Sequence, residues 1–144
     1  MKKIYLITIF LLFNSIISAN DLSGTIRVVI TDFRNDKGSL KIALFNSKEG
    51  FPDNGKKAFI KEKTTIRDKK AEFIFNDIPY GIYAVSIYHD ENGNDKLDSN
   101  FLGIPKEGYG ASNNPNPSMR PPRFDEAKFK LDSASLNIEI KAQY

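Results

Sequence analysis

The sequence has no cysteine and only one histidine among its 144 residues. Without cysteine there are no disulfides, so packing, hydrogen bonds and metal ions are what remain to stabilise the fold in an oxidising compartment. A zinc site built on several imidazoles is excluded, because a second and a third histidine are lacking. Beyond the N-terminal segment no apolar stripe recurs at helical spacing, which argues against a doubly wound α/β fold.

The chain has one long apolar run, and it lies at the N-terminus. Met1 is followed by two lysines, residues 4–13 are almost entirely apolar, and small or polar residues continue to Ala19. The run is about half of the roughly 20 residues that span a bilayer, so an anchoring helix is the weaker alternative. The order is typical of a Sec-type signal peptide over residues 1–19, cut near Ala19. No cysteine stands at the exit for lipid attachment.

The remaining residues, 20–144, are expected to form one periplasmic or secreted domain with no membrane span after signal cleavage. Removal of two lysines leaves 19 basic and 18 acidic residues, a formal charge of +1. The lysines between positions 56 and 70 alternate with acids. Nucleic-acid binding usually needs a clustered basic footprint, so this pattern predicts a solvated face and no nucleic-acid partner.

Apolar residues alternate with polar ones in short segments separated by turns, which is the pattern of half-buried strands. Such segments lie at residues 24–30, 38–45, 70–75, 82–89, 126–131 and 136–140, and the first two are the clearest. Residues 34–38 have the composition of a hairpin connection between the first two strands. The spacing predicts an all-β fold, an antiparallel β-sandwich of about seven strands, with a small barrel as the alternative.

A long irregular lobe rich in Gly, Pro and Asn occupies residues 89–124, with five of the seven prolines and four of the nine glycines. A connection of this length in a compact domain is usually functional or disordered. Apolar residues within it predict an ordered lobe whose rings and aliphatic chains pack onto the sandwich: Phe101, Leu102, Ile104, Tyr109, Met119 and Phe124.

An acidic turn opens this lobe. Asp90, Asn92, Asn94 and Asp98 fall at positions 1, 3, 5 and 9 of a calcium loop, and Lys96 would offer its backbone carbonyl at position 7. Position 6 is Asp rather than Gly, and position 12 is Phe rather than Glu, so a site here would be weak, with a Kd of roughly 10⁻⁴ to 10⁻³ M. A metal-free turn capped by its own Asx side chains fits the same residues.

His89 is the weak candidate for a catalytic residue, and a packed structural histidine is the alternative. A hydrolase would use His89 with Ser86 or Ser112 and nearby acids, in a cleft beside residues 103–123. The acids available for this role, or for paired-carboxylate chemistry, are Asp90, Asp98, Glu107 and Asp125. No Gly-x-Ser-x-Gly elbow accompanies them, so no catalytic residue is assigned.

Five strings of the chain stand out: IPYGIYA at 78–84, HDENGN at 89–94, LD at 97–98, LGIPKEGYG at 102–110 and PRFDEA at 122–127. Together they resemble the domain-of-unknown-function family 2141 of secreted bacterial proteins. The resemblance covers essentially all of residues 20–144 and implies an exported protein with a transthyretin-like or carboxypeptidase-regulatory-like sandwich. It implies no activity. Asp95 stands where the family's turn is expected to carry Gly.

Together these observations predict an exported β-sandwich that acts as a binding or structural module of the envelope, with calcium as its candidate cofactor. The expected partner is an envelope protein, a glycan or a peptide, and the expected state is a monomer. The hydrolase with His89 remains the alternative function. A purely structural envelope domain without metal or ligand is the third.

Overall fold

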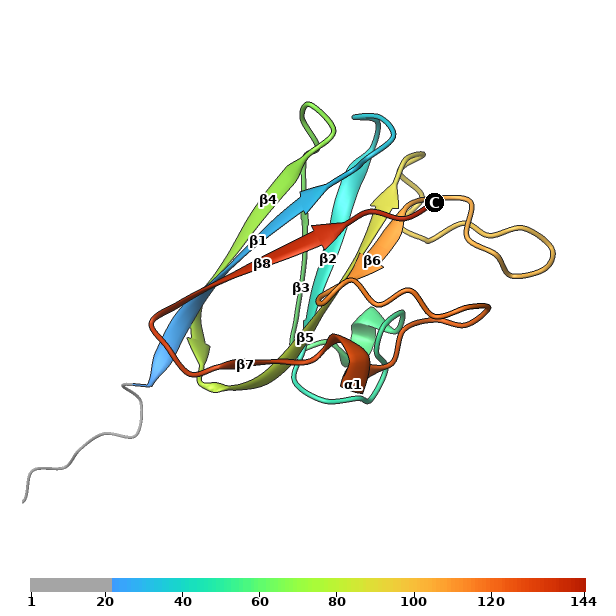
Figure 1. Cartoon of the computed structure of the whole chain (residues 1–144). Coiled ribbons are helices and arrows are strands. Elements are labelled where there is room, and N and C mark those ends of the chain that lie inside the picture. The colour runs from blue at the N-terminus through green and yellow to red at the C-terminus, as the bar shows by residue number, and fades with distance from the viewer. Residues whose placement is uncertain (1–21) are drawn as a thin grey trace, which may run out of the picture.

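The computed structural model describes residues 22–144, which form two β-sheets packed face to face (Figure 1). The predicted signal peptide at residues 1–19 lies outside the described residues. The strands are β1 (Ser23–Thr31), β2 (Ser39–Phe45), β3 (Ile60–Thr64), β4 (Ala71–Pro79), β5 (Gly81–Asp90), β6 (Tyr109–Ala111), β7 (Phe129–Leu131) and β8 (Ser135–Lys141). A 3₁₀ turn, η1 (Gly55–Lys57), and a single helical turn, α1 (Phe124–Ala127), complete the described elements. Within residues 22–144, no helix has the length and apolar character to cross a membrane.

The smaller sheet has the order β4-β1-β8, and the larger one has the order β3-β2-β5-β6, with β7 also paired to β5. All pairs between these strands are antiparallel except β1 with β8, which is parallel. The predicted all-β sandwich is therefore confirmed. The sequence predicted about seven strands, and the described residues contain eight.

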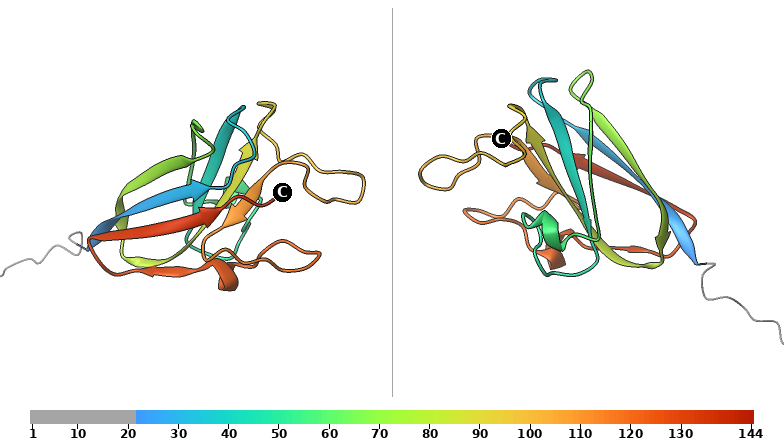
Figure 2. Two further views of the ribbon diagram at one scale, coloured as in Figure 1. Left: turned by 45° about the horizontal axis from the view of Figure 1, so that its top comes forward. Right: turned by 180° about the vertical axis from the view of Figure 1, so that it is seen from behind.

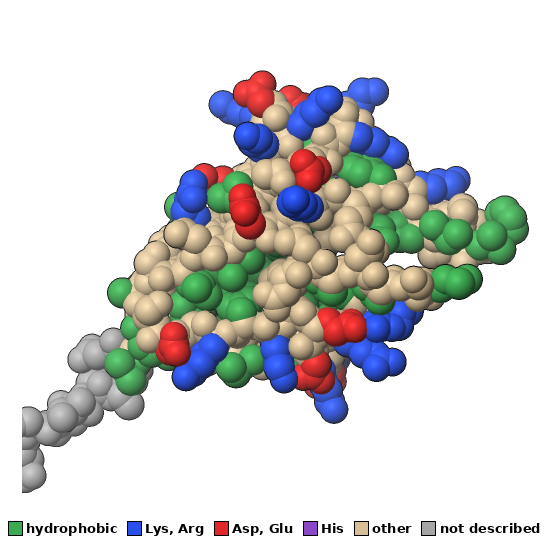
Figure 3. Space-filling model, viewed as in Figure 1, with side chains coloured by type: hydrophobic (Ala, Val, Ile, Leu, Met, Phe, Trp, Pro, Cys, Tyr) green, Lys and Arg blue, Asp and Glu red, His purple; other side chains and the backbone are tan. Residues whose placement is uncertain are grey.

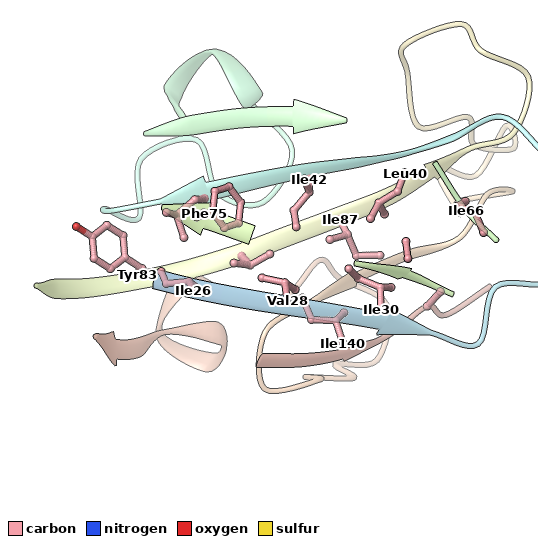
Figure 4. Close-up of a cluster of buried hydrophobic side chains, with 14 of the residues drawn as sticks. Ile26, Val28, Ile30, Leu40, Ile42, Ile66, Phe75, Tyr83, Ile87 and Ile140 are labelled. Atoms are coloured by element: carbon pink, nitrogen blue, oxygen red, sulfur yellow. The ribbon is translucent and has the colours of Figure 1, made fainter. Parts of the chain in front are cut away.

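The alternation along the strands produces one core between the sheets. Ile26, Val28 and Ile30 on β1 point inward and are fully buried, whereas Arg27 between them is exposed. Figure 4 shows these side chains meeting the inward-facing residues of β2 and β5. Within residues 22–144 the main cluster runs from Ile26 to Ala142 and joins residues of both sheets.

The predicted hairpin at residues 34–38 is wrong, because β1 and β2 belong to different sheets. Both edges of β1 are already paired, to β4 and to β8, so β2 has no free edge of β1 to join. The connection instead crosses from one sheet to the other over buried Phe33. The Asp36 carboxylate accepts hydrogen bonds from the backbone of Asp68 and Lys69, which ties the crossover to the β3–β4 turn.

The outer face of the five-stranded sheet is covered at both ends. At one end Phe51 and Phe124 pack on a small cluster of alanines from β5, β6 and α1. At the other end the chain leaving β5 folds back over Lys41 and Asp90. These covers explain why β2 is buried on both faces although its sheet has one face away from the core.

The expectation that apolar side chains pin the lobe to the sandwich is wrong for four of the six residues. Phe124 and Tyr109 are half-buried, but Met119, Phe101, Leu102 and Ile104 are exposed. Hydrogen bonds from polar side chains hold this region in place instead, as described below. The apolar side chains are therefore free to point into solvent.

Candidate functional site

The acidic turn begins where β5 ends. Asp90 is the last residue of that strand and pairs with Ser39 of β2. Strand alternation places Asp90 on the outer face of the sheet, next to Lys41 of β2. The turn covers both residues, and the Asp90 side chain is completely buried.

A buried lysine balances the Asp90 carboxylate. Lys41 Nζ lies 3.4 Å from Asp90 Oδ2 and also donates a hydrogen bond to the Asp95 carboxylate. The hydrogen bond with Asp95, assisted by Asp90, raises the pKa of Lys41, and the same contact lowers the pKa of Asp95. The two Asp90 oxygens accept the backbone N–H groups of Asn94 and Asp95, each at 3.1 Å. Asp90 thus anchors the turn as well as pairing with the lysine.

Asx side chains of the turn cap its own backbone. Asn92 Oδ1 accepts the backbone N–H of Asn94 at 3.1 Å, and Asn94 Oδ1 accepts that of Lys96 at 2.9 Å. Asp95, at position 6, has φ of 61°, the left-handed region in which a calcium loop normally carries Gly. Aspartate adopts this region more readily than most side chains, which explains how the chain makes the turn without Gly.

Three of the predicted ligand side chains converge. The amide of Asn92 lies 2.6 Å from Asp98 Oδ2, and the amide of Asn94 lies 3.1 Å from both Asp98 oxygens. Asp90 is not among them, because its carboxylate faces the lysine of β2. Residues 22–144 contain no group of three or more His, Cys, Asp or Glu side chains arranged to hold a metal ion. A cation here would therefore depend on amide and backbone oxygens as well as carboxylates.

Glu107 closes the base of the turn, a role that the sequence did not predict. Its side chain is only 4% exposed. One carboxylate oxygen accepts the backbone N–H of Glu91 at 2.9 Å, and the other accepts that of Asp98 at 3.0 Å. Glu107 therefore holds the beginning and the end of the turn together. Like Lys41, it is distant in sequence from the groups it contacts, and no local pattern could have revealed it.

His89 lies on the inner face of β5 with no exposed surface. Its Nε2 is 2.7 Å from the carbonyl oxygen of Lys37, which can only accept, so Nε2 is a donor. Nδ1 then accepts from the Tyr144 hydroxyl at 2.8 Å, and that hydroxyl accepts the backbone N–H of Arg34 at 3.1 Å. The ring also packs edge-on against Phe33. Both nitrogens are occupied by structural partners.

The two serines named for a hydrolase are also engaged elsewhere. Ser86 Oγ donates to the Pro52 carbonyl at 2.7 Å, and Ser112 Oγ donates to the Ala127 carbonyl at 2.6 Å. Neither contacts His89. The predicted nucleophiles and the predicted base are thus not assembled in one site.

A shallow hollow of about 470 Å³ lies at the α1 end of the sandwich. Its walls combine aromatic rings, prolines and charged side chains: Lys48, Phe51, Pro52, Asp53 and residues 120–125. It overlaps the end of the cleft region expected beside residues 103–123, but His89 does not line it. Of the two acids that line it, Asp125 is paired with Lys128 at 2.6 Å.

Comparison with known proteins gives one match. A family model described as an uncharacterised protein conserved in bacteria, the domain-of-unknown-function family 2141, matches residues 28–139. No curated protein and no solved structure matches the chain.

Proposed function

The chain belongs to this bacterial family of uncharacterised proteins, and on that premise we propose that it is an exported β-sandwich module of the cell envelope whose Asp90–Asp98 turn binds Ca²⁺. Its role is binding or structural rather than enzymatic. The protein acts as a monomer in the periplasm or outside the cell, and its partner is an envelope protein, a glycan or a peptide.

The observation that carries the calcium proposal is the backbone conformation of the turn. Side-chain oxygens at positions 1, 3 and 5 accept backbone N–H groups from within the turn, and position 6 is left-handed. This conformation brings alternate side chains to one side, as a calcium loop requires. Asn92 and Asn94 contact Asp98 through their Nδ2 groups, which places both amides next to the Asp98 carboxylate. Ca²⁺ would be held by Asp98, by oxygens of these amides and by the backbone carbonyl of Lys96, with Asp90 joining when its lysine moves away.

Lys41 sets the strength of the proposed site. Its ammonium group already balances Asp90 and Asp95, so an incoming cation competes with a charge that the protein supplies itself. This competition, together with only two carboxylates in the pattern, supports a low affinity, in the range of extracellular calcium modules.

The first test is thermal unfolding of residues 20–144 in EDTA, in Ca²⁺ and in Mg²⁺. Ligand at 100 times its Kd adds about 2.7 kcal/mol to the free energy of unfolding, which corresponds to a rise of several degrees in Tm. We expect this rise with Ca²⁺ but not with Mg²⁺, because Mg²⁺ demands a stricter octahedral geometry. Asp98→Asn should abolish it, whereas Asp132→Asn, an exposed acid paired with Lys130, should retain it.

Lys41→Gln should increase the stabilisation by Ca²⁺, whereas Asp98→Asn should abolish it. Removing the ammonium leaves buried Asp90 without its partner, so the variant should melt earlier than the parent in EDTA. Ca²⁺ should then stabilise it more than it stabilises the parent. Asp90→Ala is a poorer test of ligation, because it also removes two backbone contacts of the turn. A Tm that is unchanged by Ca²⁺ in both the parent and Lys41→Gln would contradict the calcium site.

A further inference from the structure

The end of the lobe presents three large apolar side chains to solvent. Phe101 is 95% exposed, Leu102 68% and Ile104 56%. The stretch from Ser99 to Pro105 contains no charged residue. Figure 3 shows hydrophobic side chains covering the tip that projects from one end of the molecule. We refer to residues 99–105 as the apolar tip. Clusters of exposed apolar side chains of this kind mark contacts with proteins or membranes.

Internal hydrogen bonds fix the backbone of the apolar tip. Asn100 Oδ1 accepts the N–H groups of Leu102 and Ile104 at 2.9 and 3.0 Å. The Asn100 N–H donates to the Ile104 carbonyl, and the Gly103 N–H donates to the Asn100 carbonyl. At the base of the tip the Lys106 N–H donates to the Asp98 carbonyl at 2.8 Å. Five backbone N–H groups between Asn100 and Lys106 are thus satisfied within the loop itself.

A second uncharged loop projects beside the first. Residues 113–119 contain no charged side chain, and Met119 at their end is fully exposed. In all the views both loops extend from the end of the sandwich that lies away from the start of β1 (Figures 1 and 2). Two neighbouring projections therefore carry exposed apolar side chains on the same side of the molecule.

The charges around the apolar tip favour an anionic surface. Lys96 and Lys106 flank it, and both are exposed and lack a salt bridge within residues 22–144. The neighbouring acids are already engaged: Glu107 is buried, the Asp98 carboxylate is bound by the amides of two asparagines, and the exposed Asp95 carboxylate pairs with Lys41. An approaching surface at this end meets apolar side chains first and ammonium groups behind them.

We propose that the apolar tip inserts into the head-group region of an anionic lipid membrane and docks the folded domain there as a peripheral protein. Hydrocarbon provides no hydrogen-bond partners, so a loop that satisfies most of its own N–H groups enters a bilayer at lower cost than an open loop. A narrow convex projection suits insertion between lipids, whereas a protein partner would need a matching pocket. Flanking lysines contribute attraction to anionic head groups. The proposal does not depend on Ca²⁺ binding.

Tryptophan fluorescence tests the insertion directly, because the chain has no tryptophan of its own. Residues 20–144 carrying Phe101→Trp would be mixed, in EDTA, with vesicles of phosphatidylcholine and phosphatidylglycerol in equal parts. We expect a blue shift of the emission and quenching by brominated acyl chains. Leu22→Trp, at an exposed site near the start of β1, should show neither. An emission from Phe101→Trp that is unchanged by vesicles would overturn the proposal.

Co-sedimentation with the same vesicles compares a matched pair of substitutions. Leu102→Ser and Leu22→Ser remove the same side chain from sites that are 68% and 65% exposed. Leu102→Ser should weaken vesicle binding about tenfold, since burying one large apolar side chain changes an equilibrium constant by about that factor. Leu22→Ser should bind as the parent does. Circular dichroism checks that both variants remain folded.

Two other outcomes would contradict membrane docking by the apolar tip. Equal losses for Leu102→Ser and Leu22→Ser would mean that binding is unspecific, which overturns the proposal. If the parent fails to sediment with vesicles but forms a dimer that Leu102→Ser abolishes, the tip is a contact between two copies of this chain. Sedimentation velocity without lipid distinguishes that result.

Discussion

Single polar side chains organise this protein through contacts that span long stretches of sequence. His89 binds the backbone 52 residues before it and the Tyr144 hydroxyl 55 residues after it. Glu107 holds both ends of the acidic turn, and Lys41 balances Asp90 from a neighbouring strand. Each of these groups is buried, and a buried polar group is costly unless it has a partner. The main effect of such residues is to select one arrangement of the chain.

Tyr144→Phe tests the contact with His89 by removing a single oxygen atom. Removing the hydroxyl leaves His89 Nδ1 as a buried acceptor without a donor, so the free energy of unfolding should fall by about 1–3 kcal/mol. Burial raises the pKa of Tyr144, so the hydroxyl keeps its proton at neutral pH and can donate it. Urea denaturation measures the loss. Tyr88→Phe, whose hydroxyl contacts the Asp95 carbonyl and no buried ring nitrogen, is the matched control and should lose less. Equal stabilities for the parent and Tyr144→Phe would contradict the assigned tautomer.

The short elements depend on caps and ion pairs more than on their own propensity. An isolated helix as short as α1, with four residues, is not stable, and its start is fixed by Glu126. The Glu126 carboxylate accepts two hydrogen bonds from Arg120 and one from the backbone N–H of Arg123. The Arg120 contact, followed by the Arg123 N–H, lowers the pKa of Glu126 to about 2. The same contacts position Phe124 against Phe51.

Glu126 should therefore make the stability of the protein depend on pH in the acidic range. A carboxyl group whose pKa is lowered by folding contributes stability above its unfolded pKa of 4.5, and this contribution is lost as the pH falls towards about 2. Glu126→Gln should flatten the change of Tm across this pH range and lower the Tm at neutral pH. Glu62→Gln, at an exposed position on β3, should leave the acid profile as in the parent. Coincident profiles for Glu126→Gln and the parent would contradict the cap.

At the scale of the whole molecule, the two sheets are joined where the chain crosses between them. The β1–β2 crossover passes so close to the end of β5 that Gly38 has room for no side chain. A Cβ there would lie 1.8 Å from the Asp90 carbonyl oxygen, and its φ is 65°. This crossover also carries Phe33 and the Lys37 carbonyl that binds His89. Core, crossover and acidic turn therefore form one connected structure.

A pair of glycine substitutions measures this packing. Gly38→Ala and Gly103→Ala both place a side chain on a left-handed backbone, at φ of 65° and 78°, but only Gly38 is crowded. In both variants the free energy of unfolding should fall by about 1–2 kcal/mol, the conformational cost of a side chain on a left-handed backbone. Gly38→Ala should lose about 1–3 kcal/mol more, because the backbone of β5 must move. Chemical denaturation of the two variants gives the difference, and equal losses would show that the crossover is loosely packed.

The sequence by itself determined the fold class and much of the acidic turn. Alternation at residues 24–30 and 40–45 predicted the strands because side chains on successive residues face opposite sides of a sheet. The spacing from Asp90 to Asp98 predicted the conformation of the turn, since Asx side chains bind backbone groups only a few residues away. The family resemblance rested on strings from the same local segments, and the match over residues 28–139 confirms it.

Only the tertiary structure decided which strands pair and which polar groups meet. The segment at residues 34–38 has the composition of a hairpin, but the partners already on β1 turn it into a crossover. β3 carries charges on both faces and lies at a sheet edge, so it shows no alternation to predict it. Exposure of the apolar tip likewise depends on Asn100 and Glu107 holding the loop away from the sandwich. Local patterns encode the conformation of short segments, whereas pairing, burial and exposure depend on contacts between residues far apart in the chain.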